Sequence, residues 1–215
     1  MTHCVLFDLD GTFADTALDL HVALNRLLSR EGKPLIDFAA FRPSVSHGSR
    51  AMLKVGFGIE HDDPKFPPLQ QQFLTLYQQN IADHTRLFSG MDTLIAELEK
   101  RTIAWGIVTN KPGYLTDPLM QRLGLDHRAC AIVSGDTTDY AKPHPEPILH
   151  ACRLANTDPA HTIYVGDAKR DIEAGRNAGT RTLIARFGYL SDQDNPAEWL
   201  ADGEIDYPLD LLDWL

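Results

Sequence analysis

The order of the strand-like segments constrains the fold of this chain more than any other feature. One short apolar run, residues 5–7, precedes about 65 residues in which apolar side chains recur only at helical spacing. Four further runs alternate with helical patterns after residue 90, at residues 103–108, 131–133, 162–165 and 182–184. Strands that alternate with helices form a parallel sheet covered on both faces. The sequence therefore predicts an α/β protein with a Rossmann-like, five-stranded parallel core sheet.

The strand-free block after the first run predicts a separate helical unit. It lies between the first and second strands along the chain, so its helices are expected to form an insertion into the α/β core. We expect a core domain of residues 1–15 and 83–215 and a helical cap domain of residues 16–82. Short terminal helices are expected around Trp199 and over residues 209–215.

Composition limits the partners of this protein. Its net charge of −10 at pH 7 argues against nucleic acid or an anionic membrane as a partner. The chain starts without a basic segment followed by an apolar one, and no apolar run approaches membrane-spanning length. Cys4, Cys130 and Cys152 are odd in number and widely spaced, which favours reduced thiols and no zinc site. We therefore expect a cytoplasmic protein, monomeric or homodimeric, that acts on a small molecule.

The first strand ends in two carboxylates, Asp8 and Asp10, followed by Gly11 and Thr12. In an extended chain, side chains two residues apart point to the same side, roughly 6–7 Å from each other. Two carboxylates that close repel unless a cation lies between them or one takes up a proton. Gly11 permits a sharp turn, and Thr12 offers a hydroxyl and an N–H to an anion. The alternative is an ordinary turn, since most Asp-Gly pairs are only that.

Further polar residues follow the other strands. Thr109 and Asn110 follow the second strand, Lys142 lies in the loop after the third, and Asp167 and Asp171 follow the fourth. Each has an alternative interpretation: a helix-capping pair, an exposed loop lysine, and acids that the helix dipole favours. Ligands of open parallel sheets bind beyond the carboxyl ends of the strands. The common placement of these residues at strand ends therefore favours one site.

The residue types suit phosphoryl transfer. A phosphate dianion repels a carboxylate nucleophile unless a divalent cation and a lysine cancel its charge. Asp8, Asp10 and Asp167 supply the hard oxygen ligands that magnesium prefers. Asp8 would attack phosphorus to form an aspartyl-phosphate, while Asp10 would protonate the leaving alkoxide and later activate water. The phosphoryl oxygens would be bound by Thr12, Thr109 and Lys142.

In order and approximate spacing, these motifs resemble the four motifs of the haloacid dehalogenase superfamily. They are Asp8-Leu-Asp10-Gly-Thr12, Thr109-Asn110, Lys142-Pro and Gly166-Asp167-x-x-x-Asp171. The helical insertion resembles the small α-helical (C1-type) cap of that superfamily. An aspartate at position 10 resembles the phosphatases and mutases, whereas the dehalogenases and transport ATPases carry other residues there.

The resemblance implies a role for each motif residue. Asp8 is then the nucleophile and a metal ligand, and Asp10 is the acid/base, which binds the metal through its backbone carbonyl. Asp167 is a metal ligand and Asp171 lies in the outer shell of the metal. The implied cofactor is Mg²⁺. Phosphate binding is implied for Thr12, Thr109, Asn110 and Lys142, of which Lys142 is also catalytic.

Within the superfamily, the chain is most similar to the phosphoglycolate phosphatases and, more closely, to the bacterial N-acetylmuramic acid 6-phosphate phosphatases. The matching segments are residues 49–52, 87–91, 105–112, 142–147 and 188–189, and residues 194–196 with Trp199. Phe13, Ala14 and Ala168 depart from the commoner residues of these groups, but none of them replaces a metal ligand. The resemblance implies hydrolysis of a small acidic sugar phosphate, in peptidoglycan recycling if the ester is N-acetylmuramic acid 6-phosphate.

Substrate choice is expected to lie in the cap. The segment His47-Gly48-Ser49-Arg50 is predicted to reach the substrate, because an arginine in a glycine-containing loop grips a carboxylate bidentately. Phosphoglycolate and N-acetylmuramic acid 6-phosphate both carry a carboxylate, so Arg50 does not choose between them. The alternative is a surface arginine at the start of a helix.

Other functions compete with this one. A 2-phosphoglycolate phosphatase would use the same chemistry, and a phosphosugar mutase would use the same aspartyl-phosphate but release little phosphate. A phospho-acceptor signalling domain also combines carboxylates, threonine and lysine on a parallel sheet. Such domains are shorter, lack a helical insertion after the first strand, and have no acid at the position of Asp10. A non-catalytic binding role is the weakest alternative, because every expected catalytic residue type is present.

Overall fold

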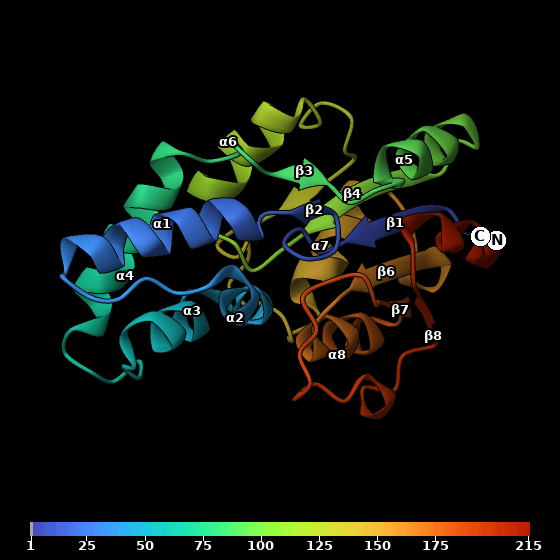
Figure 1. Ribbon diagram of the computed structural model, residues 1–215. Coiled ribbons are helices and arrows are strands. Elements are labelled where there is room, and N and C mark those ends of the chain that lie inside the picture. Colours follow the sequence, from blue (N-terminus) through green and yellow to red (C-terminus); the bar gives the residue numbers. More distant parts are fainter. Residues whose placement is uncertain (1) are drawn as a thin grey trace.

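The computed structural model describes residues 2–215 and contains a six-stranded sheet in which neighbouring strands are parallel (Figure 1). The predicted α/β class is confirmed, but the predicted number of five core strands is wrong. The sixth strand, at one edge, covers three residues (Gly-Glu-Ile) and was missed because it has no apolar run. In spatial order the strands are β5 (Ile132–Val133), β4 (Ala104–Val108), β1 (Cys4–Phe7), β6 (Thr162–Gly166), β7 (Arg181–Ala185) and β8 (Gly203–Ile205).

Helices cover both faces of the sheet. Side chains of β1 alternate: Cys4 and Leu6 pack with α7 (Glu146–Leu154) and α8 (Lys169–Ala178), whereas Val5 and Phe7 face the opposite side. The second face is covered by α5 (Met91–Lys100) and α6 (Gly113–Leu123). This two-sided burial explains why the strands are continuous apolar runs.

The predicted helical insertion is present between β1 and β4. A two-stranded antiparallel ribbon, which the sequence analysis did not predict, lies where the chain leaves the sheet and returns to it. The predicted domain limits at residues 15/16 and 82/83 fall beside this ribbon and stay a prediction. The elements of the insertion and its ribbon are β2 (Ala14–Asp15), α1 (Ala17–Arg30), α2 (Phe38–Phe41), η1 (Arg42–His47), α3 (Gly48–Phe57), α4 (Phe66–Gln79) and β3 (Arg86–Leu87).

A buried carboxylate ties the insertion to the returning chain. Asp19, in the first turn of α1, accepts hydrogen bonds from the backbone N–H groups of His84 and Thr85 and from the Thr85 hydroxyl. A buried carboxylate is stable only when donors surround it. These bonds hold α1 against the segment that leads into β3, and so help to place the cap over the sheet.

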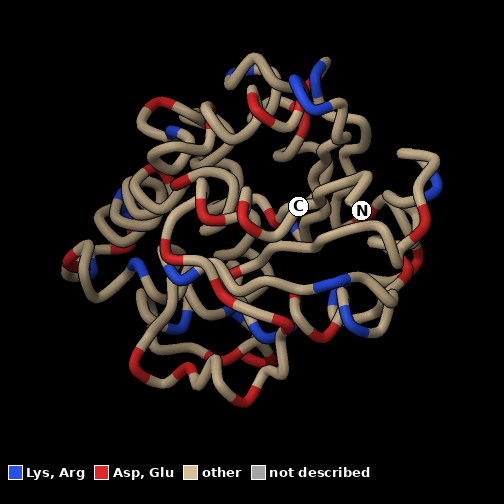
Figure 2. The backbone as a smooth tube through the Cα atoms, turned by 90° about the vertical axis from the view of Figure 1, so that its right-hand side faces the viewer, with Lys and Arg blue, Asp and Glu red and all other residues tan. Residues whose placement is uncertain are grey.

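The remaining expectations concern the C-terminal segment and the surface. The terminal helices are short 3₁₀ helices, η3 (Pro196–Glu198) and η4 (Pro208–Trp214). Figure 2 shows basic residues scattered along the trace among more numerous acidic ones, in line with the net charge of −10. Within residues 2–215, no helix is long and apolar enough to cross a membrane.

Candidate active site

Three neighbouring strands bring the first, second and fourth motifs together. β1 lies between β4 and β6, and all three run in the same direction, so their carboxyl ends meet at one edge. Asp8, Thr109 and Asp167 follow these ends directly, and each is buried. The structure thus places these predicted residues together at the centre of the sheet, as expected for an open parallel sheet.

Lys142 joins this group from the loop before α7. Its side chain is fully buried, which excludes the alternative of an exposed loop lysine. The Nζ atom lies 2.8 Å from an Asp8 oxygen and 2.7 Å from an Asp171 oxygen. It also donates to the Val108 carbonyl at 2.8 Å and lies 2.7 Å from the Tyr164 hydroxyl. A buried ammonium persists only with such compensation, so these contacts keep the charge beside the nucleophile.

The second motif holds this lysine in place. The Asn110 side chain accepts a hydrogen bond from the Lys142 N–H and donates one to the Lys142 carbonyl, both at 2.9 Å. The Thr109 hydroxyl accepts from the Lys111 N–H, and α6 begins after Pro112, so this pair does not cap the helix. Asn110 positions the loop of Lys142, while the predicted phosphate binding by Thr109 and Asn110 remains a prediction.

A cluster of buried carboxylates forms a candidate metal site. Oxygen atoms of Asp8, Asp167 and Asp171 lie within 4.8 Å of one another. The Asp167 Oδ1 atom is buried and has no hydrogen-bond partner among residues 2–215. Gly11 permits this approach: a Cβ atom there would lie 2.2 Å from Asp167 Oδ2, and its φ of +90° suits glycine. Crowded hard oxygen donors with an unpaired atom fit a divalent cation.

Asp171 has a second, structural task in this cluster. One of its oxygens accepts the backbone N–H of Ala168 at the start of α8, and the other pairs with Lys142. The alternative interpretation of Asp171 as a helix-start acid is therefore correct in part. The Oδ1 atom has no hydrogen-bond partner among residues 2–215 apart from this ion pair, and it lies in the carboxylate cluster, so the outer-shell position of Asp171 stays a prediction.

Asp10 lies apart from the other three acids and has its own cation. Lys111 Nζ donates to its two oxygens at 2.9 and 3.2 Å, and the Thr16 hydroxyl donates at 2.5 Å. Burial lowers the pKa of Lys111, but Asp10 and Tyr77 together outweigh burial and leave the pKa raised. Tyr77 of α4 covers the Lys111 ammonium at 4.5 Å from its ring centre.

The cap contacts the carboxylate cluster directly. Ser46 of η1 donates its hydroxyl to Asp167 Oδ2 at 2.6 Å, and the Tyr189 N–H donates to the same oxygen at 2.8 Å. Arg42 of η1 donates to the Gly188 carbonyl at 3.2 Å. These bonds hold η1 over the carboxyl ends of the strands.

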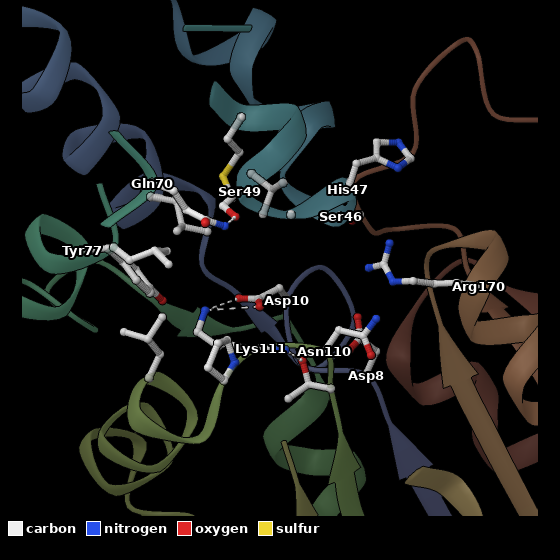
Figure 3. A pocket seen from close by; sticks show the side chains of 18 residues that line it. Asp8, Asp10, Ser46, His47, Ser49, Gln70, Tyr77, Asn110, Lys111 and Arg170 are labelled. Carbon is white, nitrogen blue, oxygen red and sulfur yellow. Dashed lines mark hydrogen bonds and ion pairs between the residues drawn. The ribbon is translucent and has the colours of Figure 1, made fainter. Parts of the chain in front are cut away.

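Core and cap enclose a cavity of about 430 Å³, shown in Figure 3. The core supplies Asp8, Asp10 and residues 109–112. The cap supplies apolar side chains, among them Leu74 and Tyr77. Of the predicted cap segment, His47, Gly48 and Ser49 line the cavity, whereas Arg50 is exposed and lies outside the lining. Substrate binding by this segment, and by Thr12 with its buried, unpartnered hydroxyl among residues 2–215, stays a prediction.

Several residues of the cavity were not predicted from the sequence, among them two cations and two polar side chains of the cap. Lys111 and Arg170 lie within the second and fourth motifs, so their positions were visible, but the direction of a side chain was not. Gln70 and Tyr77 lie on one face of α4, seven residues apart, and Gln70 donates to Ser49 at 2.7 Å. Their spacing is that of any amphipathic helix, so nothing in the sequence separated them from core residues.

The buried carboxylate cluster predicts an unusual pH dependence of the stability of the protein. Burial, together with Asp8 and Asp171, raises the pKa of Asp167 from 3.8 to about 7. Between these values the folded state of the metal-free protein holds a proton that the unfolded state releases, so stability falls as pH rises. The expected loss between about pH 4 and pH 7 is up to roughly 4 kcal/mol.

Urea unfolding with a chelator present, at pH 5 and at pH 7.5, measures this loss. Asp167→Asn removes the titrating group, so its free energy of unfolding should depend less on pH than that of the wild type. Adding a divalent cation at pH 7.5 should restore stability to the wild type only. Equal pH slopes in the two proteins would contradict the assignment.

Comparison with known proteins identifies the family. Over 207 residues the chain is 44% identical to the N-acetylmuramic acid 6-phosphate phosphatase of Pseudomonas putida, covering 96% of this chain and 93% of that protein. It is 41% identical over 207 residues to a phosphoglycolate phosphatase of Xanthomonas campestris, with the same coverage. A crystal structure of a predicted phosphoglycolate phosphatase from Haemophilus somnus superposes with a TM-score of 0.86 at 24% identity, covering 99% of this chain and 97% of that one. The family model for haloacid dehalogenase-like hydrolases matches residues 5–185, and with Asp8 and Lys142 paired beneath a helical cap the chain belongs to that family as a phosphatase, a phosphoric monoester hydrolase.

Proposed function

We propose that this phosphatase hydrolyses N-acetylmuramic acid 6-phosphate with Mg²⁺ as cofactor, as a step in peptidoglycan recycling. The observation that carries the proposal is the cavity above Asp8. Its volume of about 430 Å³ lies in the range, roughly 300–1,000 Å³, that holds ligands much larger than a two-carbon acid. The 44% identity to the Pseudomonas putida enzyme supports the same substrate.

The cap wall of the cavity suits an N-acetylated sugar. Leu74, Tyr77 and Met52 offer an apolar surface, and the Ser49–Gln70 pair offers hydroxyl and amide groups. A sugar ring presents both apolar C–H faces and hydroxyl or acetamido groups. A glycolate leaving group would leave this wall without a contact.

The first step forms a covalent intermediate. An Asp8 oxygen attacks phosphorus, the bond between phosphorus and the ester oxygen breaks, and the leaving oxygen takes a proton from Asp10. Lys142, 2.8 Å from Asp8, offsets the repulsion between the carboxylate and the incoming phosphate. For this step Asp10 must carry a proton, which requires its pairing with Lys111 to loosen when the substrate enters.

The second step regenerates Asp8. A water molecule attacks the phosphorus of the aspartyl-phosphate, Asp10 accepts the proton of that water, and inorganic phosphate leaves with the bond to Asp8 broken. The Thr16 hydroxyl, 2.5 Å from Asp10, orients its carboxylate between the two tasks. Bound to Asp8, Asp167 and the Asp10 carbonyl, Mg²⁺ would neutralise phosphoryl charge.

Phosphate release tests the proposed substrate. N-acetylmuramic acid 6-phosphate and 2-phosphoglycolate are compared at equal low concentrations, with and without Mg²⁺. We expect a higher kcat/KM for the sugar phosphate and activity only with the metal. A preference for phosphoglycolate would make the protein a 2-phosphoglycolate phosphatase, and turnover of neither ester would favour the mutase alternative.

Arg50 provides a prediction about the cap. Arg50→Ala should raise KM for an acidic ester more than for a neutral aryl phosphate, because the lost guanidinium would bind the carboxylate. Since Arg50 is exposed at the start of α3, this role requires its side chain to turn into the cavity mouth. Lys54→Ala, one turn along α3, is the control, because Lys54 pairs with Glu60 on the surface. An equal change for both esters would remove Arg50 from substrate recognition.

The setting of the reaction follows from the same proposal. We place the enzyme in the cytoplasm, where reduced thiols persist, in keeping with the free cysteines Cys4, Cys130 and Cys152. We expect the protein to be a monomer or a homodimer.

A further inference from the structure

Arg170 is a cation in the cavity whose role the four motifs do not explain. It lies in the first turn of α8, between Asp167 and Asp171, and its side chain lines the cavity. Its Nε atom is buried and has no hydrogen-bond partner among residues 2–215. A buried donor without a partner costs about 1–3 kcal/mol, so such a group calls for an explanation such as a ligand.

The environment keeps this guanidinium charged. Burial lowers the pKa of Arg170, but the carboxylates of Asp171, Asp8 and Asp167 outweigh burial and leave the pKa above its ordinary value. In the described part of the chain, no ion pair joins Arg170 to these acids, whereas Lys142 contacts two of them. Arg170 therefore carries a charge whose hydrogen-bonding capacity is unused.

The side chain points to the place where phosphorus must lie. Figure 3 shows the Arg170 guanidinium directed into the cavity from the side of Asp8 and Asn110. Lys111 and Tyr77 line the opposite side. Because phosphorus must approach an Asp8 oxygen, Arg170 is beside the phosphoryl group, and the space near Lys111 is left for the remainder of the ester.

The two lysines of the site are already engaged by oxygen atoms of the protein. Lys142 has three N–H bonds and already lies within 2.8 Å of four oxygens, those of Asp8, Asp171, Val108 and Tyr164. Lys111 is engaged with Asp10. A phosphoryl group at Asp8 offers three oxygens that need donors, and the planar fork of arginine matches two of them.

We propose that Arg170 is a further catalytic residue, which donates hydrogen bonds from its guanidinium to oxygens of the transferring phosphoryl group. It acts on the side of the group that faces α8 and the cap, and so supplements Lys142, which lies beneath Asp8. The contact is to the phosphoryl group, not to a carboxylate of the leaving group. Arg170 thus serves every ester that the enzyme hydrolyses.

The test measures binding of inorganic phosphate and turnover of two esters. With Mg²⁺ present, Arg170→Gln should weaken phosphate binding in a calorimeter at least about 10-fold. It should lower kcat/KM about 10²-fold for both a neutral aryl phosphate and an acidic sugar phosphate. The control is Lys169→Gln, since the neighbouring Lys169 is exposed and faces Glu173 at 3.7 Å; we expect its values to equal those of the wild type.

Mg²⁺ affinity measured without phosphate separates catalysis from a structural role. Removing a positive charge beside Asp8, Asp167 and Asp171 should leave Mg²⁺ binding unchanged or tighter, while phosphate binding weakens. Weakening of both would mean that Arg170 only supports the carboxylate cluster, and would overturn the proposal. Unchanged phosphate affinity, or a loss confined to the acidic ester, would overturn it as well.

A second variant, Arg170→Lys, tests the proposal if Arg170→Gln does not fold. Arg170→Lys keeps the charge but loses the fork, so phosphate affinity and kcat/KM should fall to values between those of the wild type and Arg170→Gln. Wild-type affinity in Arg170→Lys, in a folded protein, would overturn the bidentate contact. Because phosphate binding involves no ester, a different preferred substrate would contradict the proposed function without affecting this result.

Discussion

Asp8→Asn should lower kcat by at least about 10⁴-fold, because an amide oxygen does not attack phosphorus and no covalent intermediate forms. The fold should persist, since asparagine has nearly the same shape and can still accept a hydrogen bond from Lys142, which lies 2.8 Å from the carboxylate. Phosphate release from an aryl phosphate, with the far-ultraviolet circular dichroism spectrum as a check of folding, measures this effect.

Asp117→Asn is the matched control for this experiment. It makes the same chemical change on the exposed surface of α6, and we expect wild-type activity from it. Activity of Asp8→Asn above about 1% of wild type would exclude Asp8 as the nucleophile, because a missing nucleophile costs far more than a hundredfold.

Lys142→Met should lower activity strongly and also destabilise the fold. Methionine has a similar length, but it leaves the buried Asp8 and Asp171 carboxylates without their shared cation. Removing one partner of a buried ion pair costs about 3–5 kcal/mol. Loss of the charge beside the phosphoryl group should lower kcat by about 10²–10³-fold or more.

The pH dependence of this variant identifies the cause of its instability. Burial raises the pKa of Asp171 and Lys142 opposes the rise, so its pKa should rise further without the lysine. A protein that contains an acid with a raised pKa becomes less stable as pH increases. The free energy of unfolding that Lys142→Met loses relative to the wild type, measured with urea, should therefore be smaller at pH 5 than at pH 8. Lys100→Met, on the exposed end of α5, should show no such deficit. If the loss in the free energy of unfolding did not depend on pH, altered packing and not the missing charge would be its cause.

The elements that the sequence predicted best are those with strong local patterns. The strand predicted over residues 162–165 coincides with β6 except for its last residue, Gly166. The central strands are apolar runs because both faces of the sheet are buried. The edge strand β8 and the ribbon of β2 and β3 were missed, because two or three residues have no measurable periodicity and pair only when partners arrive from elsewhere in the chain.

The candidate site also has features that the sequence predicted and features that it did not. Placement of Asp8, Thr109 and Asp167 at strand ends follows from the order of strands and helices, so the sequence was enough to expect one site. The direction of each side chain was not available from spacing. Arg50 was predicted to reach the substrate but lies exposed, whereas Arg170, which was not singled out, lines the cavity.

The sequence by itself determined the α/β class, the helical insertion and the motif residues, because these depend on local hydrophobic periodicity and on residue type. Only the tertiary structure decided which groups meet. Lys142 pairs with Asp8 across 134 residues, and Ser46 of the cap bonds Asp167 across 121. Such contacts depend on how helices pack on the sheet and which rotamers that packing allows, and no local pattern encodes either.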